Sequence, residues 1–263
     1  MRQAIVAGQF YPADEKVLRM QVMDFVIKKP NKDIIGAVVP HAGYNFSGKC
    51  AGEVYGVLPD AETYVILGVN HNSIGEDIAI SLEDFETPLG IVKNDVKLGK
   101  EILKILKIDE DKKAHAYEHS IEVQLPFLQE SQEHVRIVPI ILKNYDFNVC
   151  EKLAKAIYKA SEELAKKIIV IASSDFTHTG PSYNSFQDIK IDKKAIDEIV
   201  KLHGKKFIEL AKTTTICGAG AITTTIELVK LLGAKKGKLL KYYDSSSVMP
   251  SENKVGYGGV VFL

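Results

Sequence analysis

The 263-residue chain is defined first by what it has little of: no tryptophan, three cysteines and three arginines. Three cysteines that lie far apart form no disulfide framework, so we expect a reducing compartment. Acidic and basic residues balance at 34 each, so no basic surface indicates a nucleic-acid partner. No apolar run approaches the roughly 18 residues of a membrane span. The apolar run near Met1 is too short for a signal peptide.

These absences predict a cytoplasmic protein that binds neither nucleic acid nor a membrane. The positive charge comes almost entirely from lysine, and isoleucine is abundant. This combination favours a prokaryotic source that is a thermophile or has an AT-rich genome.

Apolar, β-branched runs alternate with amphipathic helical patterns along the whole chain, which predicts the α/β class. We expect a single domain over residues 1–263. Its architecture would be a three-layer sandwich, with a largely parallel or mixed sheet covered by helices on both faces. The expected strands are 34–39, 63–69, 78–82, 135–142, 168–172, 239–245 and 256–262. The expected helices, after one near 14–26, are 47–58, 96–106, 117–128, 149–164, 192–202, 206–211 and 213–232.

The stretch IIGAVVPHAGYNFSG places a histidine at the end of a buried strand. Pro40 lacks the amide donor of a central strand, so the strand should end there and present His41. Ligands and catalytic groups of open α/β sheets gather at the carboxyl ends of strands. A loop histidine held by backbone hydrogen bonds is the alternative interpretation.

Two further strands end in the same way, one in His71 and one in Asp175 with His178. The carboxyl ends of parallel neighbours lie at one edge of a sheet, so these side chains can converge. Two imidazoles and an anionic ligand form a facial metal site with open positions. A hydrogen-bonded polar rim without metal is the alternative.

Cys217 stands where a helix is expected to begin, among Gly218, Ala219 and Gly220. A helix N-terminus favours the thiolate, so we expect a lowered pKa and either a nucleophile or a soft metal ligand. The alternative is a small buried hydrophobic residue, which is our interpretation of Cys50 and Cys150.

Glu118, His119 and Glu122 form another polar cluster. Solvated charge at a helix start is the expected role of this cluster. The functional alternative is that Glu118 or His119 orients a metal ligand or transfers a proton. The other histidines stand in polar surroundings and are expected on the surface: His115, His134 and His203.

The motifs that contain these residues resemble those of the Memo family, named after a mediator of receptor-driven cell motility. They span nearly the whole chain in the expected order: PHAGYNFSG (40–48), ILGVNH (66–71), EHSIEVQLPFL (118–128), SSDFTH (173–178), TICG (215–218) and GYGG (256–259).

The resemblance implies a fold similar to class III extradiol non-heme iron dioxygenases, with a metal pocket. His41 and His71 match two histidine ligands, and Cys217 matches the family's cysteine ligand. Asp175 and His178 match pocket residues, and His178 resembles the acid–base histidine of the dioxygenases. Family members are reported with iron or copper. Animal members have a phosphotyrosine-peptide partner, and prokaryotic members are associated with a radical SAM protein and another small conserved protein.

The cysteine departs from the dioxygenases, which complete their metal triad with a carboxylate. A thiolate is a softer ligand, so extradiol ring cleavage is not carried over with the fold. One hypothesis is a metal-dependent oxidoreductase in which iron or copper is held by His41, His71 and Cys217, with His178 transferring protons.

Two other functions remain open at this point. One is a binding or scaffold protein that uses the same pocket for a peptide or small ligand, with Phe10, Tyr11 and Tyr44 at its mouth. The other is a zinc hydrolase with a metal-activated water.

Overall fold

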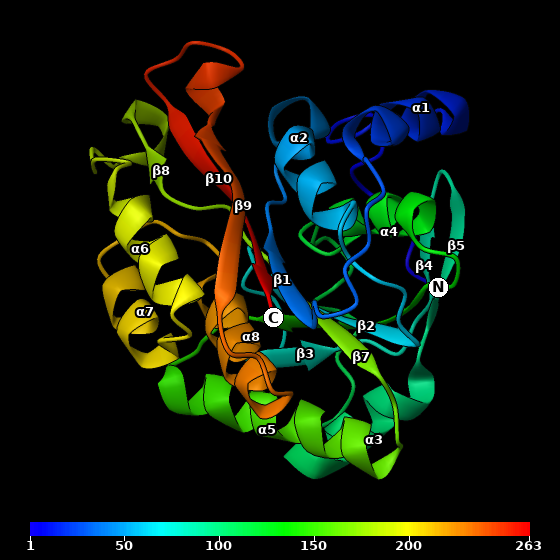
Figure 1. Ribbon diagram of the computed structural model, residues 1–263. Helices are drawn as coiled ribbons and strands as arrows, with labels where there is room; N and C mark the ends of the chain where they lie inside the picture. The colour runs from blue at the N-terminus through cyan, green and yellow to red at the C-terminus, as the bar shows by residue number, and fades with distance from the viewer.

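A mixed sheet of ten strands runs through the molecule and carries helices on both faces (Figure 1), in a computed structural model that describes residues 1–263. The main strand order is β4-β5-β6-β2-β7-β1-β10-β8, with β3 paired to β6 and β9 paired to β10. The strands are β1 (Gly36–Val39), β2 (Thr63–Val69), β3 (Ile78–Ile80), β4 (Phe85–Thr87), β5 (Gly90–Asn94), β6 (Arg136–Leu142), β7 (Ile168–Ser173), β8 (His178–Thr179), β9 (Gly237–Asp244) and β10 (Lys254–Phe262). The structure thus has the predicted α/β architecture.

The centre of the sheet is parallel, and this determines where the polar strand ends meet. β7 lies between β2 and β1 and is parallel to both. Ala172 of β7 is level with Leu67 on one side and Val38 on the other. The carboxyl ends of the three strands therefore lie at one edge of the sheet, as the sequence pattern predicts.

Each central strand is buried on both faces, which explains its continuous apolar sequence. On β7, Val170 and Ala172 pack in one hydrophobic cluster, while Ile169 and Ile171 pack in the other. This alternation follows from the two-residue period of a strand. One strand thus supplies both cores.

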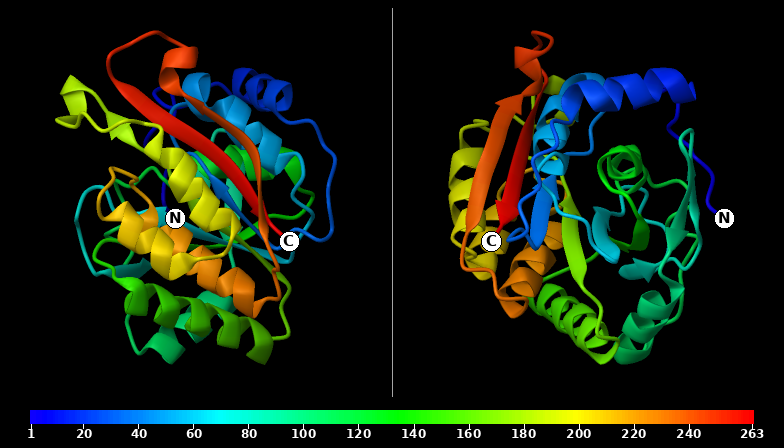
Figure 2. Two further views of the ribbon diagram at one scale, coloured as in Figure 1. Left: turned by 60° about the vertical axis from the view of Figure 1, so that its left-hand side comes forward. Right: turned by 45° about the vertical axis from the view of Figure 1, so that its right-hand side comes forward.

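The helices form two layers (Figures 1 and 2). α3, α5, α6, α7 and α8 cover one face, and α1, α2 and α4 cover the other. Their bounds are α1 (Glu15–Phe25), α2 (Tyr44–Tyr55), α3 (Val96–Leu106), α4 (Leu125–Ser131), α5 (Phe147–Glu163), α6 (Ile191–Val200), α7 (Gly204–Ala211) and α8 (Ala219–Leu231). No helix is both long enough and apolar enough to span a bilayer.

The predicted helix over residues 117–128 is the main correction to the expected elements. Residues 117–121 form turns, a short 3-10 helix follows at Glu122–Gln124, and α4 begins only at Leu125. Pro126 stands in the first turn of α4, where a missing amide donor costs nothing, so it starts this helix rather than ending one. The glutamates of this stretch are bound by other segments, as described below.

Two other boundaries also differ from expectation. α8 begins at Ala219 rather than near Thr213, so Cys217 lies in the turn before the helix. A hairpin of β4 and β5 forms over residues 85–94, where no strand was expected. Both strands of this hairpin are short.

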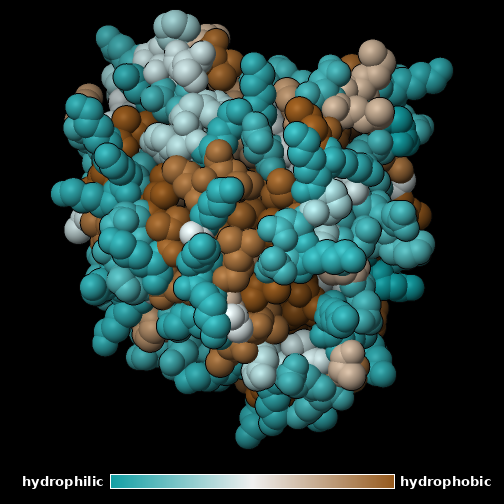
Figure 3. Space-filling view, viewed as in Figure 1, coloured by the Kyte–Doolittle hydropathy of each residue, from teal (hydrophilic) through white to brown (hydrophobic).

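The amino-terminal ends of the parallel strands lie on the side of the molecule opposite their polar carboxyl ends. Gly36 at the start of β1 pairs with Phe262 at the end of β10, so the C-terminus marks this side. Apolar side chains gather in the middle of this face in the space-filling view (Figure 3). Leu240 and Leu263 line one surface hollow and are half-buried.

Candidate metal centre

Two imidazoles and one thiol meet at the carboxyl edge of the parallel strands. His41 follows β1, His71 follows β2, and Cys217 precedes α8. Cys217 Sγ lies 3.3 Å from His41 Nε2. The metal-binding atoms of all three residues lie within 4.8 Å of one another. The rings of His41 and His71 are nearly perpendicular at 87°, with centroids 5.2 Å apart. The structure therefore brings together the three residues that the sequence separates by 176 positions.

A buried hydrogen-bond chain determines which nitrogen of His41 can bind a metal. Ser173 Oγ donates its only proton to the Ser120 carbonyl over 2.6 Å. It accepts a proton from Gln124 Nε2 over 2.8 Å, and the orientation of that amide is set by a second bond from Nε2 to the Pro40 carbonyl. Ser173 can therefore only accept from His41 Nδ1, 3.0 Å away. The proton lies on Nδ1, and the Nε2 lone pair faces Cys217.

A carboxylate binds Nδ1 of His71, just as Ser173 binds Nδ1 of His41. Glu118 accepts from the backbone amide of His71 over 2.7 Å and from its ring Nδ1 over 3.0 Å, and Ser120 N donates to it as well. Burial alone would raise the pKa of Glu118, but the bonds from His71 and Ser120 outweigh it and lower the pKa to about 2. Because an ionised carboxylate only accepts, Nδ1 of His71 carries a proton, and Nε2 is the nitrogen available to a metal. Metal-bound histidines commonly have this carboxylate partner.

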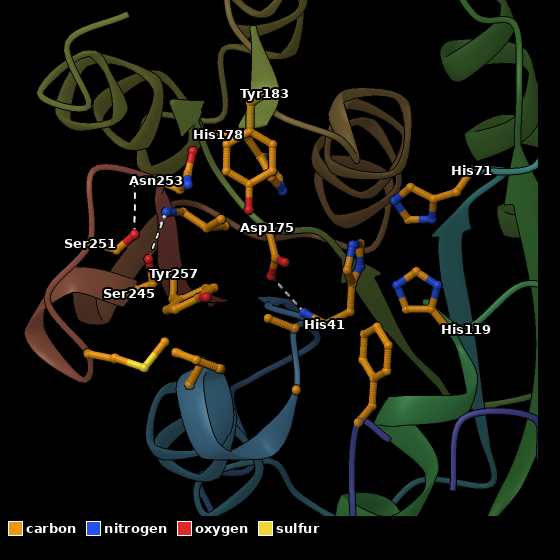
Figure 4. Close-up of a pocket in the computed structure, with 16 residues that line it drawn as sticks. His41, His71, His119, Asp175, His178, Tyr183, Ser245, Ser251, Asn253 and Tyr257 are labelled. Carbon is orange, nitrogen blue, oxygen red and sulfur yellow. Dashed lines mark hydrogen bonds between the residues drawn. The ribbon is translucent and has the colours of Figure 1, made fainter. Parts of the chain in front are cut away.

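The site opens into a cavity of about 460 Å³ (Figure 4). His41, His71 and His119 lie together on one side of it. The opposite wall comes from the segments around η2 (Pro181–Tyr183), η3 (Ser245–Ser247) and β10, and its labelled residues are Tyr183, Ser245, Ser251, Asn253 and Tyr257. None of the lining residues is a lysine or an arginine. The cavity therefore combines hydroxyl, amide and aromatic groups and has no permanent positive charge.

Asp175 and His178 also line this cavity. Asp175 Oδ1 accepts from the backbone amide of His41 over 2.8 Å. Burial raises the pKa of Asp175 to about 6, although the His41 amide and the charge of His178 act in the opposite direction. His178 Nδ1 donates to the Thr215 carbonyl over 3.1 Å, so in the neutral form of the ring the lone pair lies on Nε2. These two residues supply proton acceptors next to the three converging ligands.

Cys217 differs from expectation in its ionisation. Its pKa is raised, not lowered, mainly by burial and then by the negative charge of Asp175. The turn that contains Cys217 ends at Gly218, outside α8, so the helix dipole does not compensate for the lost hydration. The thiol is therefore protonated without a metal, and a bound divalent cation would displace the proton.

The whole chain matches known proteins. A sequence model of the family described as Memo-like protein matches residues 2–261. The chain belongs to the Memo-like family. A MEMO1 family protein of Archaeoglobus fulgidus is 38% identical over 264 residues, which cover 100% of this chain and 99% of the relative. A MEMO1 family protein of Thermococcus onnurineus is 40% identical over 291 residues, covering 100% of this chain and 99% of the relative.

In this Memo-like family member, His119 packs beside the converging ligands. Its ring stacks on that of His71 at 4.8 Å and contacts the ring of Phe10 at 4.6 Å. Its Nδ1 lies 3.5 Å from Glu118 Oε1. Burial lowers the pKa of His119. His71, Glu118 and His119 form a second group whose ligand atoms lie within 4.8 Å of one another, but Glu118 already holds His71 from behind.

Of the aromatic residues expected at the pocket mouth, only Phe10 lines the cavity. Tyr11 and Tyr44 are buried behind it. Tyr44 donates to the Val123 carbonyl and Tyr11 donates to Glu122. Their hydroxyls are thus used within the fold.

Two other expectations about polar residues are wrong. His115 is buried and not on the surface, because its Nε2 donates to the Ala79 carbonyl over 3.0 Å. Glu122 is fully buried and pairs with Arg2, so it is not solvated charge. His134 and His203 are exposed, as expected.

Sequence reasoning missed Ser173, Gln124 and Arg2. Ser173 is the last residue of an apolar strand, and its role depends on partners from two other segments. An arginine at position 2 gives no local signal of burial.

Proposed function

We propose that this Memo-like family member is an oxidoreductase that holds iron or copper through His41 Nε2, His71 Nε2 and Cys217 Sγ. The observation that carries the proposal is the convergence of three donor atoms within 4.8 Å. Hydrogen bonds at both Nδ1 atoms leave Nε2 of His41 and Nε2 of His71 as the nitrogens available to a metal. Without a metal the Cys217 thiol faces His41 Nε2, and a bound cation would displace the thiol proton and bind both atoms.

The donor set favours a transition metal over magnesium or calcium, which prefer oxygen ligands. Imidazole suits iron, copper and zinc, and a thiolate favours the softer ions. Bound iron or copper would supply one-electron chemistry and a Lewis acid at this position. Zinc shares the same ligands, so metal-assisted hydrolysis is the alternative within the enzyme class.

The residues around the ligands are suited to binding and proton transfer. In its neutral form His178 has the lone pair on Nε2, which can accept a proton from a substrate hydroxyl in the cavity. Asp175, with a pKa near 6, fixes the backbone of His41 and can exchange a proton at the cavity wall. Glu118 orients His71 from behind, and His119 with Phe10 closes one side of the cavity. The absence of lysine and arginine from the lining favours a substrate without a strong negative charge.

The direct test is metal analysis of protein purified without chelator, followed by oxygen consumption with a reductant. The triple variant His41→Ala, His71→Ala, Cys217→Ala is expected to lose the metal and the oxygen consumption. A matched control removes two exposed histidines and one buried thiol elsewhere, in His134→Ala, His203→Ala, Cys150→Ala. Metal content that is unchanged in the site variant would overturn the proposal. A wild-type protein that contains zinc and consumes no oxygen would favour hydrolysis.

The alternative is a binding or scaffold protein that uses the same cavity, which is open and partly aromatic. Its partner would be a small molecule or a peptide. Association with a radical SAM protein would also be a binding function of this kind. A phosphotyrosine peptide fits poorly because no arginine or lysine lines the cavity. Partners that are still captured after the metal is stripped, and by His178→Ala, would favour binding over catalysis.

A further inference from the structure

We propose that Arg2 is a positioning residue for the metal ligand His71 and acts through Glu118. The inference rests on the proposed metal site, because it concerns the orientation of one of its ligands. It extends that site to a residue that lies outside the cavity and contacts none of the ligands directly.

Arg2 is buried, with 3% of its side chain exposed, and it binds two backbone carbonyls of one turn. Its Nε donates to the His115 carbonyl over 3.2 Å, and its Nη2 donates to the Glu118 carbonyl over 2.5 Å. The guanidinium therefore holds both ends of the segment 115–118. A planar group with several donors in a fixed geometry is required for this arrangement.

A buried carboxylate holds the guanidinium in place. Glu122 has no exposed side-chain area and pairs with Nη1 of Arg2. Its other oxygen accepts from the backbone amide of Val6 over 3.0 Å and from the Tyr11 hydroxyl over 2.5 Å. The ion pair is thus fully hydrogen-bonded, which a buried pair needs if its geometry is to be well defined.

The segment that Arg2 binds has little structure of its own. Between the end of α3 and Glu122 the chain contains no helix or strand, and the amide of Glu118 reaches the His115 carbonyl at a long 3.4 Å. The backbone of Glu118 is therefore positioned mainly by contacts from other segments. At its carbonyl this contact is the hydrogen bond from Arg2 Nη2.

The position of Glu118 in turn determines the orientation of the metal ligand His71. Its carboxylate binds His71 at the backbone amide and at ring Nδ1, so a displaced Glu118 would displace or rotate the imidazole. Partners of this kind commonly affect metal affinity by about 10- to 100-fold when removed. Arg2 is one step further away, so the lower end of that range is expected.

The experiment measures the affinity for Co²⁺ and the visible absorption of the Co²⁺-loaded full-length protein. Arg2→Lys keeps a positive charge opposite Glu122 but cannot reach both carbonyls. We expect its Co²⁺ affinity to fall by about 10-fold, with a change in the absorption bands. The matched control is Arg19→Lys, because Arg19 is a half-exposed arginine that also pairs with glutamates.

A double-mutant cycle with Glu118→Ala tests whether Arg2 acts on His71 through Glu118. If Arg2 acts through Glu118, Arg2→Lys should have no further effect on Co²⁺ affinity once the carboxylate is gone. Equal effects in both backgrounds would overturn the inference. A purely structural role would lower the melting temperature of Arg2→Lys and leave its Co²⁺ affinity and spectrum unchanged, which also overturns it.

A second variant covers the case in which Arg2→Lys does not fold. The pair Arg2→Gln, Glu122→Gln leaves no unpaired buried charge, and the same loss of affinity is expected. If the wild-type protein binds no Co²⁺, the metal site itself is refuted together with this inference. If the wild type binds Co²⁺ and all Arg2 variants bind it equally well, only the role of Arg2 is refuted.

Discussion

Ser173 Oγ lies 3.0 Å from His41 Nδ1 and can only accept a proton from it. A single hydroxyl at the end of β7 thereby sets the tautomer of a histidine at the end of β1. As a result, the unprotonated nitrogen of His41, Nε2, points to Cys217. The ring therefore has, without any metal, the tautomer that the proposed metal site requires.

Ser173→Ala should weaken metal binding by about 10-fold. The substitution removes the acceptor of His41 Nδ1, so the ring can rotate or change tautomer. Titration of the apoprotein with Co²⁺ or Zn²⁺ measures the effect. Ser161→Ala is the control, because Ser161 is equally buried but donates to the Tyr158 carbonyl within α5. Equal affinities of the two variants would contradict the role of Ser173.

His178→Gln should separate metal binding from turnover. His178 lines the cavity without belonging to the three converging ligands. We expect metal content to stay at the wild-type level and reductant-dependent oxygen consumption to fall by about 100-fold or more. Metal analysis and oxygen-electrode assays on one preparation check both parts. Loss of the metal in this variant would show that His178 is a ligand and not a proton acceptor.

His115 should make folding stability dependent on pH. Burial lowers its pKa from 6.5 to about 4, so between these values the unfolded chain binds a proton that the folded protein does not. The stability that this neutral histidine allows is present above pH 6.5 and is lost as the pH falls toward 4, by up to about 3 kcal/mol. Urea unfolding of the wild type and His115→Gln from pH 4 to 8 measures it. The stability difference between the two should change over this range, whereas His134→Gln should follow the wild type throughout. Parallel curves for His115→Gln and wild type would refute the assignment.

Gly52 should be intolerant of a side chain, because α1 and α2 approach closely there. A Cβ at Gly52 would lie 2.3 Å from the Phe25 carbonyl oxygen, and the backbone cannot move aside cheaply. We expect Gly52→Ala to destabilise the protein by about 2 kcal/mol or more in urea unfolding. At Gly99 in α3 the Cβ meets only the flexible end of Leu82. Gly99→Ala should therefore stay within about 1 kcal/mol of wild type, since alanine also favours the helix. A larger loss of stability in Gly99→Ala than in Gly52→Ala would contradict this packing.

The strands and their polar ends were predictable because each signal is local. Residues 63–69 are apolar without alternation, as expected for β2 buried on both faces, and the polar residues follow directly. The parallel order then brings His41 and His71 to one edge. The hairpin of β4 and β5 was not predicted, because strands of three and five residues are too short to give a clear pattern.

The predictions that were wrong concern residues whose surroundings are set by contacts between distant segments. Glu118 and Glu122 share a helical spacing, but His71 and Arg2 bind them, and this favours turns over a regular helix. The pKa of Cys217 follows burial by the surrounding chain and not its distance from a helix start. His115 is buried among segments that its polar neighbours in sequence do not indicate.

X-ray absorption spectroscopy of the metal-loaded protein tests the central claim most directly. The account predicts a metal–sulfur shell at about 2.3 Å together with histidine nitrogens at about 2.0–2.1 Å, and loss of the sulfur shell in Cys217→Ser. Cys150→Ser should leave the spectrum unchanged. A bound metal with no sulfur shell in the wild type, or a sulfur shell that persists in Cys217→Ser, would contradict it.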